Sequence, residues 1–259
     1  MNIWRLIVSP PLDGASNMAL DEALFNRNAT PTLRFYFWKR PTISVGRFQR
    51  LNDDFIDKCK EASIDIVRRP TGGRAILHNS ELTYSVSAPY SMVPESSSLA
   101  SLYTLLAEWQ VDSLAAMGIK ASLAGKKGAG RRYIENNACF LSSTSFEVNV
   151  GGRKICGSAQ RRGKNYFLQH GSILIDYDFD LFPSLLKASS AVETAFTTLR
   201  KEGCHLSEAG IIDIMKSEFE KKIPCTLQEG GPSQEELKEM HRLETAYNVS
   251  FNRFGFNSP

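Results

Sequence analysis

One short segment restricts the fold of this chain more than any other. From Leu82 to Ala88 every second residue is apolar, and the three positions between them are Thr or Ser. Since successive side chains of a β-strand point to opposite faces, this alternation predicts a half-buried strand. The chain must therefore contain a sheet with one face packed against other elements.

Helical patterns flank this strand in the sequence. In residues 98–117 apolar side chains recur at three- and four-residue steps, which predicts a long helix ended by Gly118. A helix over residues 17–27, capped by Ser16 or Asn17, and another over residues 53–62 are also expected.

Further strands are expected over residues 32–38, 42–45 and 64–68. Gly151-Gly152 has the form of a tight hairpin turn between residues 145–150 and the segment that starts at Arg153. A turn at residues 163–165 would return residues 166–176 as another strand. Strands mixed with helices predict an α/β (α+β) fold with a mixed β-sheet flanked by helices.

The pattern becomes helical after residue 178. Helices are expected over residues 181–200, 206–222 and 233–247, the last opened by a capping box of Ser233 and Glu236. No glycine- or proline-rich linker precedes this part. We therefore expect a single domain over residues 1–259, with a core of about 1–180 and a helical C-terminal extension of about 181–250.

Composition excludes several functional classes. The 259 residues are 42% hydrophobic and carry 31 basic against 28 acidic side chains, a net charge of +3. This indicates a folded protein and is too mild to indicate a nucleic-acid partner. The N-terminal apolar run is too short for a membrane span and lacks the features of a signal peptide, so a cytoplasmic location without a membrane partner is expected. Five widely spaced cysteines indicate free thiols without a disulfide framework or metal site.

Three segments carry more Gly, His and polar residues than a core requires. In residues 68–78, Gly72 and Gly73 would let a ligand approach the backbone, and a nearby Arg could bind a carboxylate or phosphate; a plain turn is the alternative. In residues 153–160, small residues near Lys154 would leave room for an extended ligand beside the backbone, and Lys154 could point into that groove. The alternative is a strand with a solvated lysine. His170 interrupts an apolar strand, and a satisfied core histidine is its alternative.

Six motifs occur in order along the chain: Asn17-Met-Ala-Leu-Asp-Glu, Arg68-Arg-Pro-Thr-Gly-Gly-Arg with His78, Leu82-Thr-Tyr-Ser, Cys139-Phe, Lys154-Ile-Cys-Gly-Ser-Ala-Gln and Leu168-Gln-His-Gly-Ser-Ile-Leu. Together they resemble the lipoate/octanoate branch of the biotin and lipoate protein ligase superfamily. The resemblance covers roughly residues 17–176 and implies the catalytic-domain fold of that superfamily.

Within the superfamily the chain looks most like the cysteine-dependent octanoyltransferases. These enzymes move an octanoyl group from acyl carrier protein to a lysine of a lipoyl domain or of the glycine cleavage H protein, without a cofactor. ATP-using lipoate ligases usually have a third glycine where Arg74 stands and an Asn-Asp pair near Cys139, and neither feature is present. Cys156 stands where the family commonly has Ala.

The resemblance implies roles for individual residues. Cys139 would form the octanoyl thioester, with a buried apolar thiol as the alternative, and Lys154 would lower the pKa of that thiol or hold the acyl carbonyl. No metal is implied. The substrate-binding candidates are Arg69, Gly72, Gly73, Arg74, His78, Gly157, Ser158, Ala159, His170 and Gly171.

Carrier proteins and lipoyl domains are acidic as classes, so a basic docking rim is expected, with solvated loops as the alternative. Its candidates are Lys126, Lys127, Arg131, Arg132, Arg161, Arg162 and Lys164. Two other functions remain open: an ATP-dependent lipoate ligase without its accessory domain, in which Cys139 is incidental, and a non-catalytic binder of lipoyl domains.

Overall fold

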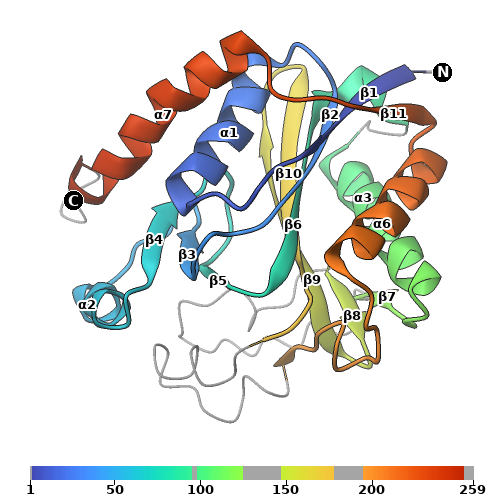
Figure 1. Ribbon diagram of the computed structural model, residues 1–259, viewed down its shortest axis with the longest axis horizontal. Helices are drawn as coiled ribbons and strands as arrows, with labels where there is room; N and C mark the ends of the chain where they lie inside the picture. Colours follow the sequence, from blue (N-terminus) through green and yellow to red (C-terminus); the bar gives the residue numbers. More distant parts are fainter. Residues whose placement is uncertain (1, 95–97, 125–146, 178–194, 254–259) are drawn as a thin grey trace.

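The computed structural model describes residues 2–94, 98–124, 147–177 and 195–253 (Figure 1). Its centre is an eight-stranded sheet in the order β11-β1-β2-β6-β10-β9-β8-β7. β1 lies parallel to both β11 and β2, and the other pairs are antiparallel. This confirms the expected mixed sheet. The strands are β1 (Asn2–Val8), β2 (Thr32–Tyr36), β6 (Glu81–Pro89), β7 (Ser122–Leu123), β8 (Val148–Val150), β9 (Arg153–Arg162), β10 (Tyr166–Leu174) and β11 (Cys225–Glu229).

Helices cover both faces of this sheet. Figure 1 shows α1 (Gly14–Arg27) and α7 (Gln234–Arg253) on one side, with α3 (Leu99–Ala116) and α6 (Glu208–Lys222) on the other. The apolar side chains of β6 belong to a core with α3 and α6. Its hydroxyl side chains lie under α1, where Ser85 donates a hydrogen bond to Asp21. β6 is thus buried on both faces, and the prediction of a half-buried strand is wrong because its polar face meets a polar helix surface.

Local signals explain most helix and turn boundaries. Ser98 caps α3, and the predicted end of this helix at Gly118 is confirmed, since Gly118 follows it with a φ of +83°. Gly151 and Gly152 have φ values of +57° and +81°, which suit the predicted tight turn between β8 and β9. α1 begins one turn earlier than predicted, because Asp13 accepts from the backbone N–H of Ser16 and so caps the helix.

A second, three-stranded sheet has the order β4-β3-β5. β3 (Thr42–Val45) lies parallel to β4 (Asp65–Arg68) and antiparallel to β5 (Ile76–His78), and α2 (Asp53–Glu61) connects β3 with β4. Of the elements in this second sheet, only β5 was absent from the sequence prediction, since three residues are too few for a periodic pattern. A 3₁₀ turn, Tyr90–Met92, follows β6.

The C-terminal part is built into the main sheet. The predicted helices α6 and α7 are present, and the capping box is confirmed by hydrogen bonds between the Ser233 N–H and Glu236 Oε2 (2.7 Å) and between the Glu236 N–H and Ser233 Oγ (3.2 Å). β11 was missed, so the extension is not purely helical. Residues 181–194 of the predicted helix 181–200 lie outside the described residues, and its end is wrong because Phe196 forms a β-bridge with Lys154.

No helix in the described part of the chain is both long enough and apolar enough to cross a membrane.

Candidate functional site

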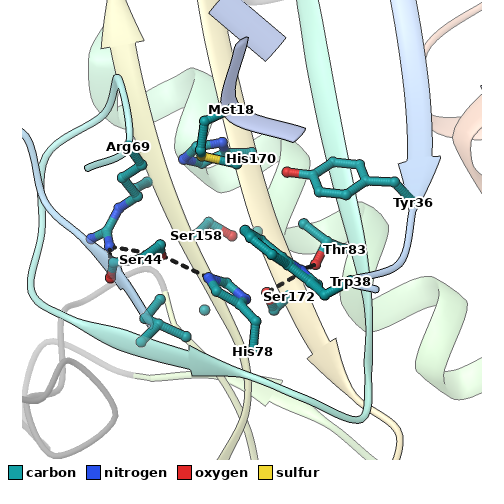
Figure 2. Close-up of a pocket in the computed structure, with 14 residues that line it drawn as sticks. Met18, Tyr36, Trp38, Ser44, Arg69, His78, Thr83, Ser158, His170 and Ser172 are labelled. Carbon is teal, nitrogen blue, oxygen red and sulfur yellow. Dashed lines mark hydrogen bonds between the residues drawn. The ribbon is translucent and has the colours of Figure 1, made fainter. Parts of the chain in front are cut away.

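A narrow pocket lies where β9 and β10 of the large sheet face β3 and β5 of the small one (Figure 2). Its inner volume is about 20 Å³, roughly the space for one water molecule. The lining side chains are mostly buried, and α1 and the end of β2 complete the wall. The lining residues are Met18, Tyr36, Trp38, Ser44, Arg69, Ile76, His78, Thr83, Gly157, Ser158, Ala159, His170, Gly171 and Ser172.

Seven of the ten predicted substrate-binding residues line this pocket, although they come from segments up to a hundred positions apart. The remaining three, Gly72, Gly73 and Arg74, form the turn between β4 and β5 and are not part of the wall. The structure thus brings together the three segments that the sequence singled out.

Arg69 organises the turn that carries the paired glycines. Its guanidinium donates to the backbone carbonyls of Ser44, Gly72 and Arg74 at 2.7 to 3.1 Å. Gly73 has a φ of +92°, and a Cβ there would lie 2.6 Å from the Arg69 Nη2. Only glycine suits both the backbone and this close approach, so Gly73 shapes the turn.

His170 belongs to a buried polar network beneath α1. Its Nδ1 lies 3.1 Å from Asp21 Oδ2 and its Nε2 lies 2.6 Å from Thr71 Oγ1. Arg34 forms an ion pair with the same Asp21 at 2.7 Å. Burial lowers the pKa of His170, although Asp21 opposes this effect, so the imidazole is neutral near pH 7. These contacts are those of a satisfied core histidine.

His78 faces the pocket from β5. It stacks on Trp38, with ring centroids 3.9 Å apart and an interplanar angle of 12°. Its Nδ1 contacts Glu81 Oε1 and its Nε2 lies 2.7 Å from Ser44 Oγ. Figure 2 shows Ser44 between this imidazole and the guanidinium of Arg69.

Lys154 is buried behind the pocket wall. Only 4% of the residue is exposed, so its alternative interpretation as a solvated lysine is wrong. Its Nζ lies 2.7 Å from Glu147 Oε1, and this carboxylate is buried as well. A Cβ at Gly157 would lie 3.0 Å from Lys154 Cε and 3.3 Å from Nζ. The glycine in the wall therefore leaves the ammonium directly behind the pocket.

Cys139, the predicted nucleophile, lies outside the described residues. The four described cysteines, Cys59, Cys156, Cys204 and Cys225, are buried and not in disulfides. Burial raises the pKa of Cys156 well above its usual range, and the charge of Lys154 offsets only part of this effect. Because the thiolate is the reactive form, Cys156 is a weak nucleophile in this environment.

The described part of the expected basic rim is partly engaged. Arg161 forms an ion pair with Glu22, and Arg162 donates to the hydroxyl of Tyr90 at 2.8 Å. Lys164 is exposed. Lys126, Lys127, Arg131 and Arg132 lie outside the described residues.

A second pocket, of about 210 Å³, lies on the other side of Arg69. Arg47, Arg68 and Arg161 line it together with Tyr247 of α7. Arg68 donates to three backbone carbonyls of the loop after β3. The cationic surface beside the first pocket thus includes Arg47 and Arg68, which the sequence did not assign to the rim.

Sequence reasoning also missed the polar residues that hold the two histidines, namely Ser44, Glu81 and Asp21. A usable signal existed for Asp21, because Asn17 and Asp21 recur at a four-residue step on the helix face that also carries Leu20 and Leu24. No local pattern marks Ser44 or Glu81. In the part of the chain that the structure describes, no group of three or more His, Cys, Asp or Glu side chains could hold a metal ion.

Comparisons with known proteins agree with this architecture. Among curated relatives, the octanoyltransferase LipM of Clostridioides difficile is 40% identical over 200 residues, covering 73% of this chain and 72% of its own. LipM of Symbiobacterium thermophilum is 34% identical over 261 residues and covers 94% of each chain.

Solved structures of similar fold include a lipoate-protein ligase A bound with ATP, with a TM-score of 0.79 and 22% identity over 95% of each chain. A bi-partite lipoate protein ligase from Thermoplasma acidophilum has a TM-score of 0.80 and 20% identity, covering 100% of this chain and 99% of its own. A family model described as the lipoyl protein ligase A/B catalytic domain matches residues 13–220. The chain therefore belongs to the lipoyl protein ligase A/B catalytic-domain family.

Proposed function

We propose that this protein transfers an octanoyl group from octanoyl-acyl carrier protein to the lysine of a lipoyl domain or of the glycine cleavage H protein, through a thioester on Cys139. The observation that carries the proposal is the 34 to 40% identity to curated relatives named octanoyltransferase LipM, one of which matches over 94% of both chains. The protein is accordingly an acyltransferase of protein lipoylation.

The proposed reaction has two steps. The Cys139 thiolate attacks the carbonyl carbon of the donor thioester, the C–S bond to the carrier breaks, and the carrier leaves as a thiol by taking up the proton that Cys139 lost on ionisation. The neutral acceptor amine then attacks the enzyme thioester, a C–N bond forms, the C–S bond to Cys139 breaks, and the leaving sulfur takes the proton that the nitrogen loses. Thioester exchange is close to neutral and amide formation runs downhill, so neither step needs ATP.

Burial and charge support Cys139 over the other candidate thiol. Cys156 is the described cysteine nearest Lys154 in sequence, but its thiol is buried and its pKa is raised. Cys139 precedes Glu147 by eight positions, and Glu147 holds Lys154 behind the pocket wall. Lys154 can therefore supply an ammonium group to an acyl carbonyl that reaches the pocket.

Two roles are expected for Lys154, and its ion pair with Glu147 favours the second, contact with the acyl carbonyl. Glu147 balances the positive charge of Lys154 at 2.7 Å, which weakens the long-range influence of that charge on a thiol pKa. A hydrogen bond from Nζ to a developing oxyanion needs only direct contact, and the space beside Gly157 allows the ammonium to approach the pocket.

The partners are expected to dock on the cationic surface beside the pocket. Arg47 is exposed beside the pocket, Arg162 and Lys164 are exposed at the end of β9 and in the turn that follows it, and residues 126–132 include further basic side chains. Attraction of acidic carrier domains to such a surface would raise the rate of encounter.

A transfer assay tests the proposal. Octanoyl-carrier protein and a lipoyl domain are incubated with the protein without nucleotide, and octanoylation of the lipoyl domain is followed by mass spectrometry. We expect multiple turnovers. Transfer from free octanoate only when ATP is present would indicate a ligase, and stoichiometric binding of the lipoyl domain without product would indicate a non-catalytic binder. Either result would overturn the proposal.

A further inference from the structure

Two hydrogen-bond chains, each consisting of a hydroxyl, an imidazole and a carboxylate group, meet at the first pocket. In one, Thr71 Oγ1 contacts His170 Nε2 and His170 Nδ1 contacts Asp21. In the other, Ser44 Oγ contacts His78 Nε2 and His78 Nδ1 contacts Glu81. Both have the connectivity that lets an imidazole take a proton from a neighbouring hydroxyl while a carboxylate orients the ring.

The two chains differ in charge balance. Asp21 is already neutralised by Arg34, and neither side chain is exposed, so a proton on His170 would place an uncompensated positive charge in the interior. In the described part of the chain, Glu81 instead pairs with His78. A proton on His78 would therefore leave this buried pair neutral overall. Charge balance therefore favours His78 over His170 as the candidate proton acceptor.

Glu81 has an unusual environment for a buried carboxylate. Only 3% of the residue is exposed. Its Oε1 accepts from Thr83 and Ser172 as well as contacting His78, whereas its Oε2 has no hydrogen-bond partner in the described structure. A buried carboxylate with one oxygen unsatisfied is costly for stability, which points to a functional reason for keeping it.

Hydrogen-bond directions in the second chain are consistent with a relay. Arg69 Nη1 donates to Ser44 Oγ at 3.2 Å, so the Ser44 hydroxyl proton is directed to His78 Nε2. Glu81 accepts from Nδ1–H, which leaves Nε2 as the ring's acceptor. Ser44 and His78 both line the pocket, whereas Thr71 of the first chain does not.

We propose that Ser44, His78 and Glu81 form the proton relay for the acceptor lysine, an inference that rests on the proposed function. The ammonium of a free lysine has a pKa of about 10.4 and cannot attack while protonated. Before the attack, one ammonium proton passes to Ser44 Oγ as the hydroxyl proton of Ser44 passes to His78 Nε2. The neutral amine then bonds to the thioester carbon, the C–S bond to Cys139 breaks, and the leaving sulfur takes the second nitrogen proton. Glu81 is a positioning residue that stabilises the resulting imidazolium.

The test separates the two half-reactions. Wild-type protein and the variants His78→Gln, Glu81→Gln and Ser44→Ala are acylated with a small octanoyl thioester, and release is then measured with a lipoyl domain or with hydroxylamine, which is unprotonated at neutral pH. His241→Gln is the matched control, since His241 also pairs with a carboxylate, that of Glu244, but is exposed on α7.

We expect His78→Gln to slow transfer to the lipoyl lysine by roughly 10²- to 10⁴-fold at neutral pH. Glu81→Gln and Ser44→Ala should show smaller losses in the same step. Because Ser44 and His78 also line the pocket, acylation and release to hydroxylamine can fall as well, but by at least about tenfold less than transfer to the lysine. Raising the pH toward the pKa of free lysine should restore part of the transfer. Circular dichroism shows whether each variant is folded, and any one of the three that folds carries the test.

Equal losses with both acceptors, or wild-type transfer to the lipoyl lysine by a folded variant, would overturn this inference alone. Failure of the wild-type protein to form an acyl-enzyme would overturn the proposed function as well. Because wild-type acylation is measured first, the two failures are distinguishable.

Discussion

The polar side of the central sheet depends on one fully buried ion pair. Arg34 of β2 donates to Asp21 at 2.7 Å and also to Ser9 and Asn17. The hydroxyl of Tyr36 donates to the second oxygen of Asp21 at 2.8 Å. Burial would raise the pKa of Asp21, but the charge of Arg34 and the hydrogen bonds from its neighbours hold it below its usual value.

Removing one partner of this pair should be costly. We expect Asp21→Asn to lower the free energy of unfolding by about 3 to 5 kcal/mol, because Arg34 would remain buried without its counter-charge. Urea unfolding measures this loss. Asp57→Asn, which removes an exposed ion pair with Lys60, is the control and should have little effect.

The sign of the pH dependence follows from the lowered pKa of Asp21. Its stabilising contribution is fully present above the unfolded-state pKa of about 3.9 and is lost as the pH falls toward the lower folded-state pKa. The stability difference between wild type and Asp21→Asn should therefore shrink below about pH 4. A constant difference down to lower pH would contradict this assignment.

Lys154 is the second residue whose role can be isolated. Lys154→Met keeps the aliphatic stem but removes the hydrogen-bond donor behind Gly157. We expect slower acylation of the protein and slower transfer, by about 10²-fold or more in each, because removing one oxyanion contact of this kind costs about 3 kcal/mol. Both rates are measured by quenching each reaction at set times and determining the octanoylated product by mass spectrometry. Lys154→Met also leaves the buried carboxylate of Glu147 without its counter-charge. The double variant Lys154→Met with Glu147→Gln removes this charge, so activity still lost in the double variant reflects the missing ammonium group. Full activity of Lys154→Met would exclude the proposed role.

At the scale of elements, the site depends on close contact between β9 and β10. A Cβ at Gly171 would lie 2.6 Å from the backbone oxygen of Gly157 and 2.8 Å from side-chain atoms of Ser158 and Tyr84. Backbone cannot move as easily as a flexible side chain. The glycine is therefore required by packing between the strands.

We expect Gly171→Ala to lower stability by about 1 to 3 kcal/mol, the usual range for overpacking. Gly72→Ala is the matched control for stability, since a Cβ at Gly72 would have no atom within 4 Å. Thermal unfolding of both variants gives the comparison. Equal stabilities would show that the strands accommodate the added methyl group.

Elements with a clear period or cap were predictable from sequence, and those defined by distant partners were not. The long helix α3 and the hairpin turn at Gly151 and Gly152 follow from local residues. β1 and β11 were missed because each is a short segment that pairs with the other from opposite ends of the chain. The burial of both faces of β6 likewise depends on α1, whose polar face no local pattern of β6 reveals.

At the scale of the whole molecule, the fold assembles the pocket from both sheets and α1. The sequence identified the segments that line it, because glycines and histidines there exceed what a core needs. It did not identify Ser44 or Glu81, whose importance arises only when β3, β5 and β6 bring them to the two sides of His78. Residue type alone could not have distinguished these two from other buried polar residues.

The cationic surface should make partner recognition sensitive to salt. Exposed charges are screened over roughly 8 Å at physiological ionic strength, so higher salt should slow transfer from octanoyl-carrier protein by weakening encounter. Arg162→Glu with Lys164→Glu should act in the same way. Acylation by a small uncharged octanoyl thioester is the control and should be almost unchanged. Equal loss with both donors would place these residues in the active site.

The thioester on Cys139 is the central claim and can be measured directly. The protein is mixed with octanoyl-carrier protein without ATP and without a lipoyl domain, and its intact mass and peptide map are determined. We predict one octanoyl adduct, mapped to Cys139, and none on the Cys139→Ala variant. An adduct on Cys156, or no adduct on a wild-type protein that transfers octanoate, would contradict the account.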